Sequence, residues 1–352
     1  MPRERAATQR AATQSRSVAA RSASELTYAA AVREALRTCL RDDPDVVLTG
    51  EDIGVYGGAF GVSEGLLEEF GPTRIIDTPI SEEAAVGAAV GAAITGMRPI
   101  VEMQFSDFIV NAIDPLVNQA AKLHFMYGGN TTVPMVVRGP AGGGTGAAAQ
   151  HSQSLEAWFA HVPGLKVVMP AFPQDAHDLL LASVADPNPV VFFEHKVLYK
   201  TSSPVEVRKQ IGDTPERLGT AKVIRSGNDC TIVAYSIMAV RALEAAEQLA
   251  ARGIDAEVID LRTLRPLDID TVRASVRKTG RLLVSHEAPG PVGVGAEVVA
   301  GVAESNALDY LLAPVARVCG RDNPMPYASN LEQATIPQVD DVVKAAAELM
   351  ED

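Results

Sequence analysis

Short runs of consecutive apolar residues alternate along the chain with amphipathic stretches of helical period. Before residue 200, the apolar runs predict strands at 46–48, 74–77, 100–105, 133–138, 165–169 and 190–194. Between them, apolar positions three and four residues apart predict helices at 28–40, 82–95, 107–125 and 174–185. Continuous apolar strands separated by helices are typical of a parallel sheet covered on both faces. The pattern therefore predicts an α/β fold.

The same alternation resumes after a polar, proline-containing segment, residues 201–219, which we interpret as a linker. Beyond it, the pattern predicts strands at 231–235, 256–260, 282–285 and 315–318, with helices at 240–251 and 339–349. We therefore expect two parallel-sheet domains. The expected boundaries are a basic tail at 1–24, a first domain at 25–200, the linker, and a smaller domain at 220–352.

Composition narrows the class of protein. A chain of 352 residues can bury two cores of ordinary size. Its formal net charge of −13 argues against a nucleic-acid partner, because phosphate binding needs a concentrated basic surface. Cys39, Cys230 and Cys319 lie far apart without CxxC spacing, so they predict neither a disulfide framework nor a zinc site. The longest apolar run, 84–94, is too short to cross a bilayer.

The first 24 residues differ in kind from the rest of the chain. They contain five arginines and one glutamate, and almost nothing that could enter a core. This composition is typical of a disordered basic tail, but it is also typical of an organellar transit peptide. We expect a disordered tail on a cytoplasmic protein, with the mitochondrial matrix as the alternative location.

Candidate chemistry is concentrated in RIIDTPISEEAAVGAAVG, residues 74–91. A strand ends there at a proline, and Ser81 is placed to cap a helix whose first turn holds Glu82 and Glu83. A carboxylate at the carboxyl end of a strand, where a helix begins, is well placed for chemistry in an α/β fold. Both acids could equally serve only to complement the helix dipole. The segment alone leaves both interpretations open.

Motifs further along the chain favour a functional role for the segment that contains Glu82 and Glu83. Phe108 lies in VEMQFSDF and His151 in AAQHSQSLEAWFAHVPGLKVVMP, and IDAEVIDLRTLRPLD and RLLVSHEA follow. From about residue 26 to 349 the chain resembles the beta chain of the thiamine-diphosphate-dependent, decarboxylating first component of 2-oxo acid dehydrogenase complexes. The resemblance implies a transketolase-like pyrimidine-binding domain followed by a transketolase carboxyl-terminal domain.

The resemblance also implies roles for three residues. Glu82, and not Glu83, matches the glutamate that stabilises the imino tautomer of the cofactor through N1′ of its aminopyrimidine. Phe108 matches the aromatic residue that stacks on that ring. His151 matches a histidine that handles substrate and the transfer to the lipoyl group. Judged alone, a Phe beside a strand is more often part of the core, and a His in a loop is more often a hydrogen-bonding spacer.

The implied enzyme is incomplete without partners. The chain contains no GDG motif, so a separate alpha subunit is expected to hold the diphosphate and Mg²⁺, in an α₂β₂ heterotetramer. A lipoyl acyltransferase, the second component, would receive the acyl group. Pyruvate is the expected substrate, and acetoin and branched-chain 2-oxo acids remain alternatives. The segment VFFEHKVLY (191–199) looks slightly more like acetoin-cleaving relatives, whereas HSQSLEAWFAHVPGLKVV looks as much like pyruvate enzymes. Ser183, Asp186 and Asn188 match positions that help to hold potassium in relatives, yet Asp-Pro-Asn-Pro is also an ordinary turn.

Two other kinds of protein are alternatives to the beta subunit of a 2-oxo acid dehydrogenase. Gly144, Gly146 and Ala149 fit G-x-G-x-x-A after a strand, as in an NAD-dependent Rossmann dehydrogenase. That fingerprint should open directly into a helix, whereas QHSQS follows here, and no acidic residue ends a strand about 20 residues later. A non-catalytic assembly subunit is the other interpretation, and the presence of Glu82, Phe108 and His151 argues against it.

Overall fold

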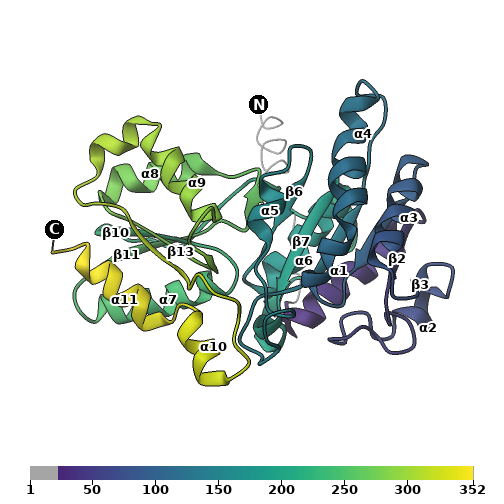
Figure 1. Cartoon of the computed structure of the whole chain (residues 1–352), viewed down its shortest axis with the longest axis horizontal. Coiled ribbons are helices and arrows are strands. Elements are labelled where there is room, and N and C mark those ends of the chain that lie inside the picture. Colours follow the sequence, from purple (N-terminus) through teal and green to yellow (C-terminus); the bar gives the residue numbers. More distant parts are fainter. Residues whose placement is uncertain (1–22, 352) are drawn as a thin grey trace, which may run out of the picture.

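The computed structural model describes residues 23–351, so the predicted basic tail lies almost wholly outside the described residues. The described chain forms two α/β units side by side, each with a central sheet between helices (Figure 1). The predicted class, two parallel-sheet domains, is confirmed. In the described part of the chain, no helix combines the length and the apolar character that a membrane span requires.

The first sheet has seven strands in the order β12-β6-β7-β5-β4-β2-β3. Six of them are parallel, and all six correspond to predicted strands. The bounds are β2 (Val46–Gly50), β3 (Ile75–Asp77), β4 (Arg98–Glu102), β5 (Val136–Ala141), β6 (Lys166–Val168) and β7 (Val190–His195). The seventh, β12 (Thr263–Arg265), comes from the second half of the chain and pairs antiparallel with β6. The motif DLRTLRPLD thus joins the two domains.

Helices cover both faces of this sheet (Figure 1). They are α1 (Tyr28–Asp42), α2 (Leu66–Phe70), α3 (Glu82–Ile94), α4 (Ala121–Met126), α5 (Glu156–Ala160) and α6 (Pro173–Ala185). The expectation of one helix at 107–125 is wrong. That segment forms a 3-10 helix η1 (Ser106–Ala112), a π-helical stretch η2 (Asp114–Ala120) and then α4. Pro115 lacks the N–H that a continuous α-helical ladder would need there.

The predicted linker is partly regular. A 3-10 helix η3 (Lys196–Lys200) precedes it, and within it β8 (Ser202–Val205) pairs antiparallel with β1 (Ser24–Thr27), followed by a short turn η4 (Ile211–Asp213). The pairing brings the two ends of the first domain together. The Thr27 side chain then caps α1 by accepting the Ala30 N–H at 3.1 Å.

The second sheet has five strands in the order β14-β13-β10-β11-β9, and only β9 runs antiparallel to its neighbour. Its strands are β9 (Lys222–Arg225), β10 (Cys230–Ala234), β11 (Ala256–Asp260), β13 (Leu282–Pro289) and β14 (Ala316–Gly320). Its helices are α7 (Ile237–Ala250), α8 (Ile269–Thr279), α9 (Val294–Ala303), η5 (Asn306–Tyr310), α10 (Ser329–Thr335) and α11 (Val339–Glu348).

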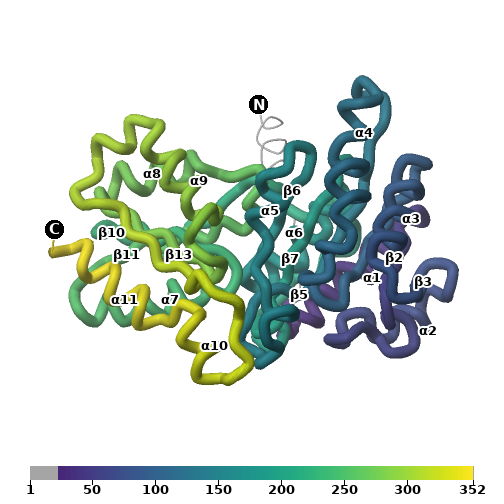
Figure 2. The backbone as a smooth tube through the Cα atoms, in the orientation of Figure 1, coloured from purple at the N-terminus to yellow at the C-terminus, as the bar shows by residue number. Residues whose placement is uncertain are grey.

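The apolar cores of the two domains are in contact. Each of the two clusters of buried apolar residues draws members from both sheets. In Figure 2 the yellow segment that leads into α10 runs along the boundary between the domains, close to the teal part of the first domain. Continuous apolar packing fixes how the domains sit against one another, because interiors at native density resist sliding. The second domain can therefore position groups in the first.

Candidate functional site

Polar and aromatic side chains collect where β2, β3 and β4 end, at neighbouring places in the sheet. Glu51 directly follows β2, Glu82 opens α3 after β3, and Phe108 lies on η1 after β4. Because these strands are parallel, their carboxyl ends meet at one edge, which is where open α/β sheets bind ligands. The site is built at this edge.

Glu82 is the first residue of α3 and is partly exposed. Its Oε2 accepts a hydrogen bond from Asn111 Nδ2 of η1 at 3.3 Å, whereas the neighbouring Glu83 is exposed. Ser81 occupies the N-cap position of this helix, as expected, but among the described residues its side chain makes no capping hydrogen bond; its carbonyl oxygen accepts the Ala85 N–H at 3.0 Å. Glu82 thus faces η1, and Glu83 faces solvent.

Glu51 also lies at this edge of the sheet, although no sequence motif marks it. It is buried, with 8% of its surface exposed, and lies close to Glu82. Burial and the negative charge of Glu82 raise the pKa of Glu51, and a hydrogen bond from the Ser81 backbone N–H offsets part of the rise. Its position directly after the strand VVLTG is the same signal that singled out Glu82.

Phe108 and His151 are in direct ring contact. Their ring centroids lie 5.2 Å apart with an interplanar angle of 84°. Phe105 completes the cluster, edge-on to His151 at 4.9 Å and to Phe108 at 6.1 Å. Phe108 is partly exposed and shares η1 with Asn111, which contacts Glu82. The structure therefore brings together Glu82, Phe108 and His151, which lie far apart in the sequence.

His151 is held by contacts on both sides. The buried Lys196 donates from Nζ to the His151 carbonyl oxygen and lies 5.3 Å from the centre of the Phe105 ring. The Gln153 N–H donates to the buried Asp107 at 2.8 Å. Burial lowers the pKa of the Lys196 ammonium. The sequence gives no sign of this role for Lys196, because a lysine after a strand is ordinarily solvated.

The glycine-rich loop 142–149 does not form a free phosphate cradle. The N–H groups of Gly144 and Gly146 donate to Glu332 Oε1 at 2.8 and 3.1 Å, and the Gly143 N–H donates to Glu287 Oε1 at 2.6 Å. Positive φ at Gly144 (+90°) and Gly146 (+71°) turns these groups to one side. The donors that a dinucleotide would need already bind carboxylates of this chain, which argues against the dehydrogenase interpretation.

The residues predicted for potassium are engaged with protein partners. Lys166 forms an ion pair with Asp186, whose other oxygen accepts both the backbone and side-chain N–H groups of Asn188 at 2.9 Å. The Ser183 hydroxyl donates to the Leu179 carbonyl at 2.7 Å. These side chains are paired within the protein, and the potassium site stays a prediction.

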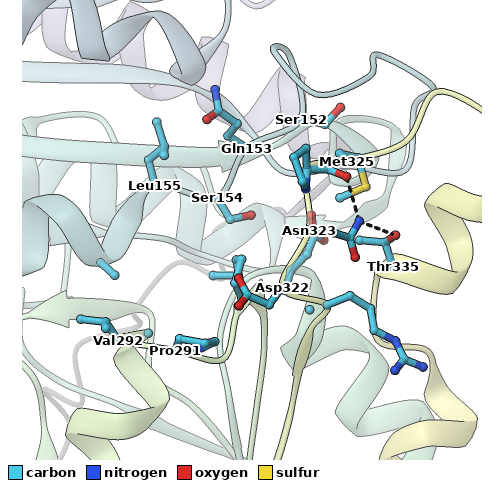
Figure 3. A pocket seen from close by; sticks show the side chains of 18 of the residues that line it. Ser152, Gln153, Ser154, Leu155, Pro291, Val292, Asp322, Asn323, Met325 and Thr335 are labelled. Atoms are coloured by element: carbon cyan, nitrogen blue, oxygen red, sulfur yellow. Dashed lines mark hydrogen bonds between the residues drawn. The ribbon is translucent and has the colours of Figure 1, made fainter.

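A cavity of about 720 Å³ opens between the domains beside the His151 loop. Figure 3 shows Ser152 and Gln153 of that loop on one side and Asp322 and Asn323, from the segment after β14, on the other. The Asn323 amide donates to the Pro324 carbonyl at 2.8 Å and orders that segment. The loop that carries His151 therefore lies between the ring cluster and this interdomain cavity.

Comparison with known proteins agrees with this arrangement. Residues 24–202 match the family "Transketolase, pyrimidine binding domain", and residues 219–342 match "Transketolase, C-terminal domain". A solved structure described as a split gene transketolase, an inactive beta4 tetramer, is similar with a TM-score of 0.75, covering 93% of this chain and 98% of that chain. Its sequence identity is 23%, so the likeness concerns the fold.

Sequence relatives are closer. The chain is 48% identical over 341 residues to pyruvate dehydrogenase E1 component subunit beta-2, mitochondrial, of Oryza sativa subsp. japonica, covering 96% of this chain and 90% of that protein. It is 46% identical over 320 residues to the pyruvate dehydrogenase E1 component subunit beta of Rhizobium meliloti (strain 1021), covering 91% and 69%. The chain therefore belongs to the transketolase-like family of pyruvate dehydrogenase E1 component beta subunits.

Proposed function

We propose that this chain is the beta subunit of a thiamine-diphosphate-dependent pyruvate dehydrogenase, active only together with an alpha subunit. The enzyme decarboxylates pyruvate and transfers the acyl group to a lipoyl group. The observation that carries the proposal is the convergence of Glu82, Phe108 and His151 around η1, in a chain nearly half identical to such beta subunits.

The residues at the sheet edge fit the aminopyrimidine half of the cofactor. Glu82 offers a partly exposed carboxylate to N1′, and Phe108 offers a partly exposed ring for stacking. When bound, thiamine diphosphate supplies a nucleophilic thiazolium carbon and accepts the electron pair left by departing CO₂. Glu82 is placed so that it would hold a proton at N1′ of the aminopyrimidine ring.

Glu51 supports this role through electrostatics. The raised pKa of Glu51 means that it keeps a proton to higher pH than an ordinary glutamate, and Glu82 is one cause of that rise. A carboxyl group that keeps its proton places less negative charge beside a neighbouring carboxyl group. We assign this proton to Glu51, and the more exposed Glu82 is the carboxyl group that would face the cofactor.

His151 serves the substrate. Its partly exposed imidazole is fixed edge-on to Phe108, and its backbone is held by Lys196. An imidazole can donate an N–H to a carboxylate and can carry a proton, so His151 would contact the substrate and assist transfer to the lipoyl group. The contact with Phe108 would keep it next to the ring on which the cofactor stacks.

The partners follow from what the chain lacks in sequence. Without a GDG motif, the diphosphate and Mg²⁺ would be held by the alpha subunit, in an α₂β₂ heterotetramer that delivers acyl groups to a lipoyl acyltransferase. No step is assigned to potassium, because the side chains predicted to bind it are paired within the protein. The proposed location is the cytoplasm; the matrix would apply if the tail is a transit peptide.

The decisive experiment is a substrate panel. The chain is purified together with its alpha subunit, and reduction of an artificial electron acceptor is followed with pyruvate, with branched-chain 2-oxo acids and with acetoin. We expect the highest kcat/KM with pyruvate and no turnover by either chain alone. A higher kcat/KM with acetoin or a branched-chain acid would show that pyruvate is not the substrate. NAD-dependent turnover by this chain alone would refute the proposal.

A further inference from the structure

Two carboxylates of the second domain bind the backbone of the loop that carries His151. Glu332 of α10 is 3% exposed and accepts the N–H groups of Gly144 and Gly146, the latter with both oxygens at 3.1 Å. Glu287 of β13 accepts the Gly143 N–H. Both contacts join residues more than 140 positions apart. Neither glutamate has a role in the chemistry described above.

A backbone hydrogen bond joins the two ends of the loop that carries His151, and close packing surrounds its glycines. The Gly142 N–H donates to the Gln153 carbonyl at 3.1 Å, which makes 142–153 one closed loop. It is also packed tightly: a Cβ on Gly143 would approach Met325 Cε to 2.8 Å, and a Cβ on Gly144 would approach Val197 Cγ2 to 2.9 Å. The loop can therefore occupy this place only with its backbone donors turned toward the second domain.

Glu287 is itself held in one orientation and one charge state. His195, at the end of β7, contacts Glu287 Oε2 through Nε2 at 2.9 Å. His195 Nδ1 accepts the Val197 N–H, so the hydrogen-bond pattern assigns the proton to Nε2, which donates to Glu287. Burial alone would raise the pKa of Glu287, but His195 and the Gly143 N–H outweigh it, and the pKa falls below its ordinary value. Glu287 therefore acts as an ionised acceptor.

We propose that Glu332 and Glu287 are positioning residues, through which the second domain holds the His151 loop in register with the ring cluster of the first domain. A charged acceptor satisfies N–H groups that would otherwise be left unpaired, and such bonds are stronger than neutral ones. Losing them frees residues 143–146 and lets His151 move away from Phe108. The effect on catalysis rests on the role proposed above for His151; the anchoring of the loop does not.

The test uses Glu332 variants in the complex with the alpha subunit. Glu332→Ala removes the acceptor, whereas Glu332→Gln keeps Oε1 as a carbonyl oxygen that can accept both N–H groups. Glu257→Ala is the matched control, because Glu257 is also a buried glutamate of the second domain (4% exposed) but binds Ser275 and Lys278, away from the loop. Amide hydrogen exchange of peptides covering 142–153 and steady-state kinetics are measured for each.

We expect Glu332→Ala to speed exchange in the loop by about tenfold or more. The kcat should fall about tenfold or more while KM changes little, because misplaced groups cost turnover. Glu332→Gln should reverse part of both changes, because its single neutral oxygen accepts more weakly than a carboxylate, and Glu257→Ala should leave loop exchange unchanged. If Glu332→Ala does not fold, Glu332→Asp replaces it: its shorter side chain keeps the charge but withdraws from the loop, and it should show the same changes to a smaller extent.

The outcomes separate this inference from the proposed function. Loop exchange in Glu332→Ala equal to that in Glu257→Ala would overturn the anchoring. Faster exchange with unchanged kcat in an active enzyme would overturn the link to His151. A wild-type complex that turns over none of the proposed substrates would refute the proposed function instead, and the exchange data would still decide the anchoring.

Discussion

At the scale of single residues, the site depends on how two nearby glutamates differ. Glu82 is partly exposed and bound to Asn111, whereas Glu51 is buried behind it. Burial and the charge of Glu82 raise the pKa of Glu51, so Glu51 keeps its proton to a higher pH than an ordinary glutamate. In the proposed function, the more exposed Glu82 is the carboxyl group that meets the cofactor.

The first prediction concerns Glu82→Gln in the complex with the alpha subunit. The amide is nearly isosteric but cannot exchange a proton with N1′, so kcat should fall by about 10²-fold or more while the complex stays assembled. Glu83→Gln is the control: Glu83 is exposed, and its loss should leave kcat near that of the wild type. Wild-type kcat in Glu82→Gln would remove Glu82 from the mechanism.

The second prediction uses Asp260, which is fully buried at the end of β11. Burial and the nearby Asp175 raise the pKa of Asp260 from 3.8 to about 8. Between these values the folded chain holds a proton that the unfolded chain releases. Raising the pH through this window therefore destabilises the folded state, and the loss is complete above about pH 8.

Asp260→Asn is neutral at every pH and should remove this slope. The unfolding midpoint of the variant relative to the wild type should rise steadily from pH 5 to pH 8 in thermal melts of the chain. Asp309→Asn, on an exposed residue of the same domain, should leave the slope unchanged. A difference between Asp260→Asn and wild type that does not vary with pH would show that Asp260 is ionised in the folded chain.

Part of this site is predictable from the sequence. Motifs identify Glu82, Phe108 and His151, and the structure brings them into one cluster, while their catalytic roles stay predictions. Lys196 and Glu332 could not be identified, because each acts through a contact to a distant backbone group. A pattern along the chain records burial and period, and it does not show which backbone atom a buried charge will meet.

At the scale of elements, the sequence predicts the strands that have long apolar runs but not the strand that forms by pairing with a distant edge. The six parallel strands of the first sheet follow from their apolar runs. The strand β12 is only three residues long and belongs by sequence to the second domain, yet it completes the first sheet at β6. Local periodicity cannot show such a strand, because its stability comes from the sheet edge that it covers.

The third prediction tests a close approach between elements. Gly164, in the turn before β6, has φ +101°, and a Cβ there would collide with the Ala121 carbonyl at the start of α4. Gly164→Ala should lower stability by the cost of its backbone conformation, about 1–2 kcal/mol. Overpacking should add about 1–3 kcal/mol.

Gly71→Ala is the control for backbone strain alone, because Gly71 has φ +79° and no atom lies within 4 Å of the place that a Cβ would take. The difference between the thermal unfolding midpoints of the two variants gives the cost of overpacking, apart from the cost of the backbone conformation. Equal midpoints for Gly164→Ala and Gly71→Ala would mean that α4 moves aside freely, and that the turn does not fix where α4 begins.

At the scale of the whole molecule, the proposed function makes this chain one side of a shared site. Its first domain presents the groups suited to the aminopyrimidine, and its second domain holds the loop that carries His151. Phosphate binding requires donors or a metal, and the glycine-loop donors are occupied by Glu332 and Glu287. We therefore expect the anchor of the diphosphate on another subunit.

Calorimetric titration of thiamine diphosphate with Mg²⁺ tests this central claim most directly. The cofactor is titrated into this chain alone, into the alpha subunit alone and into the assembled complex. We expect no measurable heat of binding with this chain alone and saturable binding with the complex, and Glu82→Gln should weaken the latter without abolishing it. Binding by this chain alone at micromolar concentration would contradict the account, because it would place the diphosphate and metal anchors within these 352 residues.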